Sequence, residues 1–323
     1  MKTTWTAATA ALIAAMAAPA FAQQIDRPEC VAPAQPGGGF DLTCRVAQLG
    51  LEPQLGKPMQ VTFMPGGIGA VAYNLFNTTR TDDGSAIVAF STGSILNVVT
   101  GKYGEWTIDD ARWVATAGAD FGAVVVRADS PYENLEQLMA DLKEDPSQVV
   151  LGAGGSVGSQ DWMKAALLLD SVEGDVRGLR YVAFDGGGDA MAGLLGGSIE
   201  VYTGDVGELS SQLEAGTIRV LAVMSKDRLG EPFADIPTTY EQGFEVDWTI
   251  LRGFYMGKDV SDEDYNAWVQ TFEDAYGTEE WSATVTKLGL LPLNMAGDEL
   301  EASVRERAEQ LRQIAADAGI IQN

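Results

Sequence analysis

A glycine-rich turn is the first feature of this sequence whose residue types could do chemistry. Pro36-Gly37-Gly38-Gly39-Phe40-Asp41 lies between an apolar run and a segment of helical periodicity. Glycines let a backbone approach a ligand closely, and the free N–H groups and dipole of a helix N-terminus favour a carboxylate or phosphate. We expect an anion-binding turn here, with Asp41 capping the helix that follows. A tight turn without a ligand is the alternative for this segment taken alone.

Four more turns of this kind follow apolar runs. They are Pro65-Gly66-Gly67-Ile68-Gly69, Thr92-Gly93-Ser94, residues 152–159 and Gly186-Gly187-Gly188. Ligands of open α/β sheets lie in the crevice at the carboxyl ends of the strands. The set of turns therefore predicts a ligand cleft, and the alternative is two rigid domains with ordinary turns.

Several patterns suggest an enzyme, but each lacks a necessary part. Gly154-Gly155-Ser156-Val157-Gly158 has the spacing of a nucleophile elbow, yet the chain contains no His to complete a triad. No glycine run keeps the spacing of a dinucleotide or Walker motif. Asp185, Asp189 and Asp205 match no calcium loop, and we interpret them as acids that bond nearby backbone amides.

These patterns lead us to expect no catalytic residue, no metal and no cofactor. Ser156 is then interpreted as a hydrogen-bond donor to a ligand. The alternative is an exported hydrolase that uses paired Asp and Glu side chains on a carbohydrate or an ester. It would depend on Asp41, Asp185 or Asp205.

Alternating apolar runs and helix-period segments must position these turns. Strands are expected at residues 31–33, 59–63, 87–90, 113–117, 123–126, 149–151, 180–184 and 219–223. Helices are expected at residues 42–51, 70–76, 135–142, 162–169, 190–195, 265–276 and 300–318. Strand, glycine turn and helix in repetition predict an α/β fold of two lobes with a cleft between them.

The length also fits two domains, since 323 residues allow about 150 residues for each. We place chain crossings near residues 126–129 and 224–226. Domain 1 then comprises residues 23–127 and 226–323, and domain 2 comprises residues 128–225. The helices at 265–276 and 300–318 are expected to cover the first lobe.

The charge of the chain limits its partners. It holds 21 Lys and Arg against 46 Asp and Glu, a formal net charge of -25 at pH 7. Such a field repels phosphate backbones and anionic lipid surfaces. We therefore expect no nucleic-acid partner.

The N-terminal segment indicates export. Lys2, an apolar run over residues 7–18 and Ala20-Phe21-Ala22 have the order of a secretory signal peptide. Cleavage after Ala22 would make residues 1–22 the signal peptide and Gln23 the first residue of a periplasmic protein. An uncleaved N-terminal anchor is the alternative, although the run is short for a membrane span.

Export also bears on the two cysteines. Cys30 and Cys44 flank the first glycine turn, and paired cysteines of exported proteins usually form a disulfide. A bridge would stiffen that turn, provided that the two Cα atoms lie within about 7 Å. Two buried free thiols are the alternative.

Taken in order along the chain, these segments resemble the substrate-binding proteins of tripartite tricarboxylate transporters, the TctC or Bug type. The family pattern P-x-x-P-G-G-x-x-D is matched at residues 33–41, and Arg45 follows on the helix. Further matches are Pro65-Gly66 with Gly69, the G-x-G-S-like residues 152–156, and the region 221–243 with Arg228 and Pro237-Thr238. Departures are Asp161 near a frequent His, Phe184 for Tyr and Glu200 for Asp.

The resemblance implies a two-lobed periplasmic-binding-protein-like fold that closes on a small organic anion and delivers it to membrane permease subunits. Members of the family hold the ligand carboxylate with backbone amides, hydroxyls and waters. Carried over, the ligand-binding residues are Gly38, Gly39, Phe40, Asp41, Thr92, Ser94, Ser156, Ser159, Phe184, Gly186, Gly187 and Asp205.

The ligand class follows from the same resemblance. Cysteines that bracket the first glycine turn resemble the tricarboxylate subgroup, so a citrate-like di- or tricarboxylate is expected, bound by a monomer. Arg252 precedes an apolar run and is a candidate counter-charge, with a surface ion pair as the alternative. Two alternatives stay open. The ligand could be another carboxylate, such as an aromatic or nicotinate-type acid, and the protein could serve a membrane sensor instead of a permease.

Overall fold

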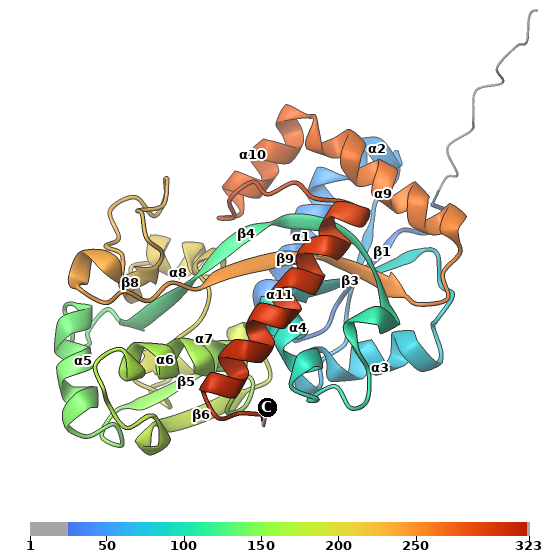
Figure 1. Cartoon of the computed structure of the whole chain (residues 1–323). Coiled ribbons are helices and arrows are strands. Elements are labelled where there is room, and N and C mark those ends of the chain that lie inside the picture. The colour runs from blue at the N-terminus through green and yellow to red at the C-terminus, as the bar shows by residue number, and fades with distance from the viewer. Residues whose placement is uncertain (1–24, 322–323) are drawn as a thin grey trace, which may run out of the picture.

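A mixed sheet runs through both lobes of the molecule (Figure 1). The computed structural model describes residues 25–321, and within this range nine strands follow the order β2-β1-β3-β9-β4-β7-β5-β6, with β8 paired to β4. The predicted signal peptide and its cleavage site lie outside the described residues. No helix among the described residues is long and apolar enough to cross a membrane.

The first lobe is built around parallel strands next to one antiparallel strand. β1 pairs in parallel with β2 and β3, and β9 runs antiparallel between β3 and β4. The strands are β1 (Glu29–Ala32), β2 (Gln60–Phe63), β3 (Ala86–Ser91), β4 (Ala111–Arg127) and β9 (Thr249–Gly257). The helices are α1 (Gly39–Gly50), α2 (Glu52–Leu55), α3 (Ala70–Thr78), α4 (Thr92–Val99), α9 (Asp262–Tyr276), α10 (Glu279–Lys287) and α11 (Asp298–Asp317).

The second lobe continues the sheet from the far half of β4. There β4 pairs antiparallel with β7 and β8, and β5 pairs in parallel with β6 and β7. The strands are β5 (Val150–Gly154), β6 (Arg180–Phe184), β7 (Val201–Tyr202) and β8 (Ile218–Met224). The helices are α5 (Leu135–Glu144), α6 (Gln160–Asp170), α7 (Gly187–Leu195) and α8 (Ser210–Glu214).

Short 3-10 turns complete both lobes. They are η1 (Gly67–Gly69), η2 (Ile108–Asp110), η3 (Val176–Gly178), η4 (Val206–Glu208) and η5 (Tyr240–Gln242).

Strand β4 differs from the sequence-based expectation of two short strands. It is one strand of 17 residues that pairs with β9 up to Phe121 and with β8 from Gly122 onward. Register shifts near Ala115 and Gly118 bend it, and Gly118 adopts a φ of +150°, which glycine tolerates. β4 and β9 therefore connect the lobes, while the domain limits near residues 127 and 225 stay a prediction.

Helix α11 also differs from expectation, because it reaches beyond the first lobe (Figure 1). It packs on α4 and β4, and its last turns lie beside α6, where Ile314 and Ile320 line a cavity with Trp162 and Met163. The amphipathic pattern predicted the helix but not that it spans both lobes.

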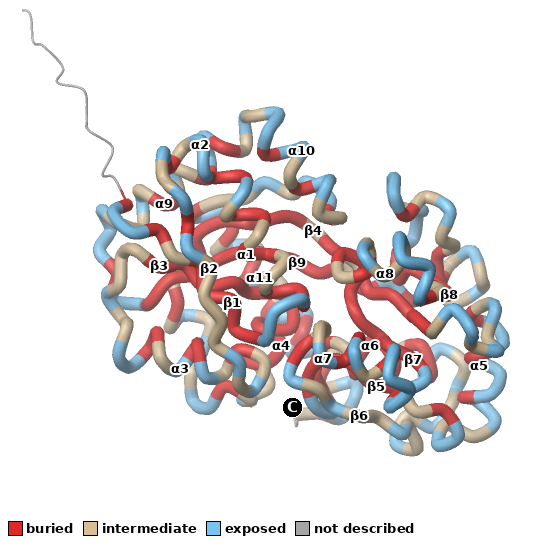
Figure 2. The backbone as a smooth tube through the Cα atoms, turned by 180° about the vertical axis from the view of Figure 1, so that it is seen from behind, coloured by how far each residue is buried: buried red, intermediate tan, exposed pale blue. Residues whose placement is uncertain are grey.

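Burial follows the sheet (Figure 2). The tube is buried along the central strands and exposed on the outer turns of the peripheral helices, and every residue of β3 is buried. This continuous burial explains why β3 is apolar up to its last residue, Ser91, since helices cover both faces of a parallel sheet.

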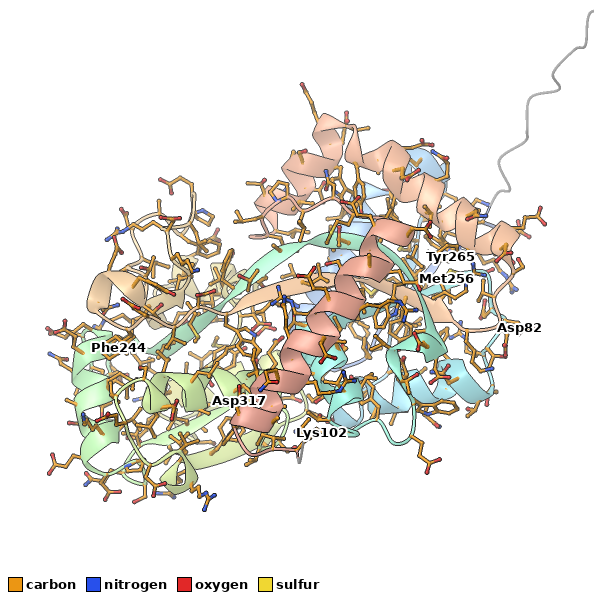
Figure 3. All side chains as sticks on the ribbon, viewed as in Figure 1. Asp82, Lys102, Phe244, Met256, Tyr265 and Asp317 are labelled. Atoms are coloured by element: carbon orange, nitrogen blue, oxygen red, sulfur yellow. A yellow bond between two sulfur atoms is a disulfide. The ribbon has the colours of Figure 1, made fainter. Side chains whose placement is uncertain are left out.

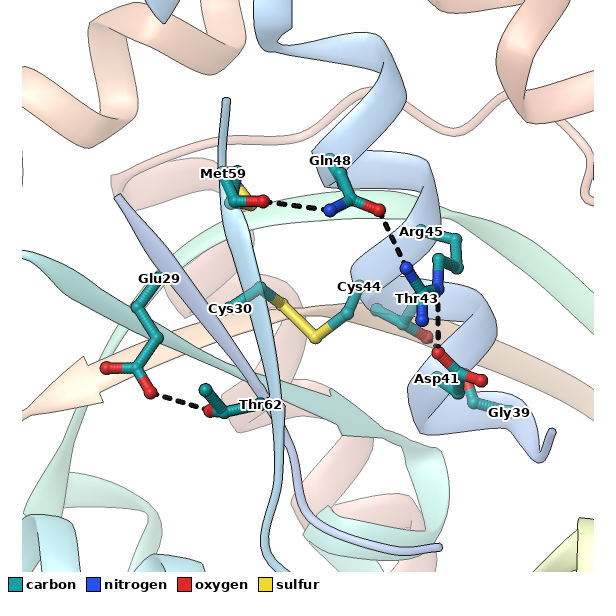
Figure 4. Close-up of a disulfide and its surroundings, with 10 residues drawn as sticks. All are labelled: Glu29, Cys30, Gly39, Asp41, Thr43, Cys44, Arg45, Gln48, Met59 and Thr62. Carbon is teal, nitrogen blue, oxygen red and sulfur yellow. Dashed lines mark hydrogen bonds and ion pairs between the residues drawn. A yellow bond between two sulfur atoms is a disulfide. The ribbon is translucent and has the colours of Figure 1, made fainter. Parts of the chain in front are cut away.

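The predicted disulfide is confirmed (Figure 4). Cys30 on β1 and Cys44 on α1 are bridged, with Cα atoms 5.6 Å apart, and both side chains are fully buried. The bridge closes a loop that contains the first glycine turn, and closure of a loop of this length contributes about 3 kcal/mol in the chain-entropy estimate. It fixes α1 against β1 and thereby holds the turn between them.

Candidate functional site

The first glycine turn leads directly into helix α1. Gly38 is the N-cap residue, with extended backbone and no side-chain cap, so the expectation that Asp41 caps the helix is wrong. Asp41 lies in the first helical turn, where it accepts a hydrogen bond from the Gly37 N–H at 2.9 Å and pairs with Arg45. Its carboxylate therefore holds the turn together.

Four helix N-termini meet at one inner cavity between the lobes. α1 and α4 reach it from the first lobe, and α6 and α7 reach it from the second. The inner cavity has a volume of about 50 Å³ and is lined by Ala34, Gly38, Gly39, Phe40, Ile68, Ser91, Gly93, Asn97, Gly154, Ser159, Gln160, Asp161, Gly186, Gly187, Asp205, Glu208 and Arg252. Converging N-termini present free N–H groups and positive dipole ends to a bound anion.

The two lobes approach closely at this cavity. A Cβ added to Gly38 would lie 3.2 Å from the Gly187 nitrogen and 3.3 Å from the Gly188 nitrogen on the opposite lobe. Glycine at position 38 lets the two helix N-termini come this near to each other, and a Cβ there would require the opposing backbone to shift by a few tenths of an ångström. The structure thus has a nearly closed cleft.

A larger outer cavity continues from the inner one. It has a volume of about 540 Å³, shares Ile68, Asn97 and Ser159 with the inner cavity, and includes Ser156 and Phe184. At its rim, Lys102 of the first lobe donates a 2.7 Å hydrogen bond to the Val157 carbonyl of the second. Figure 3 shows Lys102 between the lobes, near the C-terminal end of α11.

Most of the sequence-predicted ligand residues line these two cavities. Eight line the inner cavity: Gly38, Gly39, Phe40, Ser159, Gly186, Gly187, Asp205 and Arg252. Ser156 and Phe184 line the outer cavity.

Asp41, Thr92 and Ser94 line neither cavity. The Thr92 hydroxyl accepts from the Leu251 N–H at 2.8 Å, and the Ser94 hydroxyl accepts from the Ser91 N–H at 3.2 Å. Both hydroxyls therefore fix the start of α4 instead of facing the cleft.

Arg252 forms a buried ion pair, not a surface one. Its Nε and Nη2 donate to Asp120 at 2.9 and 2.7 Å, and Nη2 also donates to Asp205 at 2.6 Å. A Cβ on Gly39 would collide with Nη1, so the guanidinium lies against the first glycine turn. Burial alone would lower the pKa of Arg252, but Asp120 and Asp205 raise it, which keeps the side chain charged.

Lys164 is a second buried cation, which the sequence analysis missed. It is fully buried on α6, where its Nζ donates to Asp161 and the Gly204 carbonyl at 2.7 and 2.8 Å and pairs with Asp205. Burial alone would raise the pKa of Asp205, but Lys164 and Arg252 hold it below its usual value. Asp205 therefore accepts from side chains, not from nearby backbone amides as predicted.

Three further acids lie near Arg252 and Lys164, namely Asp120, Asp161 and Glu208. Burial raises the pKa of Asp161 and of Asp120 despite their cationic partners. Burial, together with the nearby charge of Asp205, raises the pKa of Glu208 to about 8. Glu208 receives a hydrogen bond from the Tyr202 hydroxyl.

With this geometry established, comparison with known proteins identifies the family. The sequence model described as "Tripartite tricarboxylate transporter family receptor" matches residues 43–320. The chain belongs to this family. It is a solute-binding protein of the TctC type.

Relatives of this receptor agree with the assignment. It is 25% identical to the "UPF0065 protein in gbd 5'region" of Cupriavidus necator, over 97% of the receptor and 95% of that relative. It is also 25% identical to protein BugT of Bordetella pertussis, over 67% of the receptor and 65% of BugT.

Solved structures confirm the predicted periplasmic-binding-protein-like fold. The receptor matches BugD, described as a periplasmic binding protein, with a TM-score of 0.80 and 21% identity, covering 91% of the receptor and 98% of BugD. It matches MatC from Rhodopseudomonas palustris with bound malate at a TM-score of 0.75 and 17% identity, covering 89% and 98% of the two chains. It matches R. palustris Rpa4515 with adipate at a TM-score of 0.81 and 18% identity, covering 91% of the receptor and 97% of Rpa4515.

We expect Gly38→Ala to hinder closure of the receptor without unfolding it. The φ of Gly38 is -101°, which alanine adopts freely, so the added Cβ would meet only the opposing backbone of α7. Affinity for a carboxylate that stabilises the wild type in a thermal-shift screen should fall at least tenfold in calorimetric titration. Urea unfolding of the ligand-free variant should change by about 1 kcal/mol, the usual effect of losing a good N-cap residue.

Gly230→Ala is the matched control, because a Cβ there meets no atom within 4 Å and the backbone is not left-handed. It should leave affinity unchanged. Unchanged affinity of Gly38→Ala would show that the lobes bind ligand without the close approach of α1 and α7.

Proposed function

We propose that the receptor is exported to the periplasm, captures a small di- or tricarboxylate between its lobes and delivers it to permease subunits of a tripartite tricarboxylate transporter. The proposal rests on one observation above all: four helix N-termini from both lobes converge on one cavity. Malate and adipate in the structures of MatC and Rpa4515 support a carboxylate ligand.

The local donors explain how a chain with a net charge of -25 could bind an anion. Salt screens distant charges beyond about 8 Å, whereas N–H groups at hydrogen-bond distance act on the ligand unscreened. The carboxylate would accept from the amides of Gly38, Gly39 and Gly187, at the starts of α1 and α7. The net negative charge of the protein then slows the encounter with the anion more than it weakens the bound complex.

Closure would couple binding to delivery. β4 and β9 pass between the lobes, so bending of these strands would move domain 1 (residues 23–127 and 226–323) against domain 2 (residues 128–225). The closed monomer would present a joint surface of both lobes to the permease. Binding and closure, not catalysis, would be its activity.

A thermal-shift screen tests this proposal. The protein is denatured and refolded to remove bound ligand and is then screened with citrate, tricarballylate, malate, succinate, adipate, aromatic carboxylates and nicotinate. A ligand at a hundred times its Kd adds roughly 2.7 kcal/mol of stability, a shift of a few degrees for a protein of this size. Folded protein that responds to none of these acids would contradict the substrate class, and neutral solutes and enzyme assays would follow.

A further inference from the structure

One turn of the second lobe receives hydrogen bonds from the first. This interlobe turn, residues 155–158, lies between β5 and α6. Lys102, which follows α4 in the first lobe, donates to the Val157 carbonyl at 2.7 Å and to the Ser156 hydroxyl at 3.3 Å. Within residues 25–321, Lys102 forms no ion pair and bonds only these two oxygens, so its charge is directed at the opposite lobe.

Apolar side chains of the first lobe contact both ends of the same turn. A Cβ added to Gly155 would lie 3.5 Å from Cγ1 of Ile68 in η1, and one added to Gly158 would lie 3.0 Å from Cγ2 of Ile320, which follows α11. Glycine at position 158 lets Ile320 come this close. Three separate segments of the first lobe therefore meet on four residues of the second.

The sequence at the end of α11 places Ile320 against the interlobe turn. The chain leaves the helix through Gly319, whose φ of +70° is the left-handed conformation that ends many helices. The N–H groups of Gly319 and Ile320 donate to the carbonyls of Ala316 and Ala315 at 2.9 and 2.8 Å, the paired bonds of a Schellman motif. Because α11 packs on α4 and β4, Ile320 moves with the first lobe.

Backbone hydrogen bonds tie the interlobe turn to the second lobe and to the inner cavity. The Gly155 N–H donates to the Phe184 carbonyl on β6 at 2.8 Å, and the Ser159 N–H donates to the Ser156 carbonyl at 2.8 Å. Ser159 then caps α6 and, together with Gln160, lines the inner cavity. A contact that holds the turn therefore also holds the residues that face the proposed ligand.

We propose that these contacts form a latch: when the lobes close, Ile68, Lys102 and Ile320 grip the interlobe turn and slow the release of the bound solute. The contacts join opposite lobes, so opening must break the hydrogen bonds of Lys102 and expose the apolar surface of Ile320. The open receptor lacks them, so they slow opening more than they speed capture. The latch extends the proposed function, on which it rests for the solute that closure retains.

Stopped-flow release of an acid from dye-labelled receptor tests the latch. Cysteines introduced at Asp82 and Glu136, exposed residues of opposite lobes, carry a donor and an acceptor dye, and the native cysteines stay unlabelled because they are bridged and buried. Malate, adipate and citrate are tried in turn as the probe. Loaded receptor is mixed with excess unlabelled receptor, and the dyes report the opening of the lobes.

Lys102→Met and Ile320→Ala should each speed the opening of the loaded receptor about fivefold, while the rate of capture changes less than about twofold. Lys57→Met and Leu49→Ala are the matched controls. Lys57 donates to the Asp26 carbonyl within the first lobe, and Leu49 is a 53% exposed apolar side chain of α1. Both controls should release the acid at the wild-type rate.

The possible outcomes separate the latch from the proposed function. Release at the wild-type rate from both Lys102→Met and Ile320→Ala would overturn the latch and leave the proposed function intact. Should no carboxylate bind, the proposed function fails, and the dye distance in acid-free receptor then tests the latch by itself. The double variant should hold the lobes further apart than the wild type does, and equal distances would overturn the latch as well.

Discussion

Replacing Lys164 with methionine should cost about 3–5 kcal/mol of unfolding free energy and abolish ligand binding. Lys164 is fully buried and pairs with Asp161 and Asp205. Methionine keeps the length of the side chain but leaves Asp161 without a paired cation and Asp205 with Arg252 alone. Urea unfolding at pH 7 measures the stability, and titration with the carboxylate found by thermal shift measures the binding.

Two further variants separate charge from packing. Lys143→Met removes an exposed lysine from the end of α5 and should change neither quantity. Adding Asp161→Asn to Lys164→Met removes one of the unpaired carboxylates and should recover part of the lost stability. If the double variant is no more stable than Lys164→Met alone, the loss comes from packing and not from the uncompensated charge.

The glycine turns were predictable because their signals are local. Each turn lies between a strand and a helix, so the residues that start α1, α6 and α7 could be placed at the cleft from sequence alone. The disulfide was predictable for a similar reason, since export and the position of Cys30 and Cys44 around one turn do not depend on distant segments.

The buried ion network was not predictable, because it joins segments that are distant in sequence. Asp120 lies on β4, Lys164 on α6 and Arg252 on β9, and they meet only where both lobes and the connecting strands come together. The available signal was a lysine three residues after Asp161 on a helix that is otherwise apolar on that face. β9 itself was missed, because Arg252 and Gly253 interrupt the apolar run of the strand.

The hydroxyls of Thr92 and Ser94 show a different limit. Serine and threonine after a strand can either face a ligand or bond the backbone of the helix that they begin, and the residue types are the same in both cases. Here the Thr92 hydroxyl satisfies β9 and that of Ser94 completes the cap of α4. Asn97, one turn further along α4, is the side chain that reaches the cavities.

Glu208→Gln should stabilise the ligand-free receptor in a manner that depends on pH. The pKa of Glu208 is raised from 4.5 to about 8, so the folded chain holds this proton more tightly than the unfolded chain does. The stabilising contribution of the protonated form is complete below about pH 4.5 and is lost as the pH rises to about 8. Glutamine resembles the protonated side chain and cannot ionise, so the variant should lack this loss.

Urea unfolding at intervals from pH 4.5 to pH 8.5 measures the difference. Wild type and variant should be similar at the acidic end, and the variant should be more stable by on the order of 3 kcal/mol at the alkaline end, allowing for the water that reaches the cavity. Asp120 and Asp161 titrate in both proteins, so their contributions largely cancel in the comparison, and Glu214→Gln should follow the wild-type curve. A difference that stays constant across this range would mean that Glu208 is ionised in the folded receptor at every pH tested, and the carboxyl group would then be a permanent negative charge in the cleft.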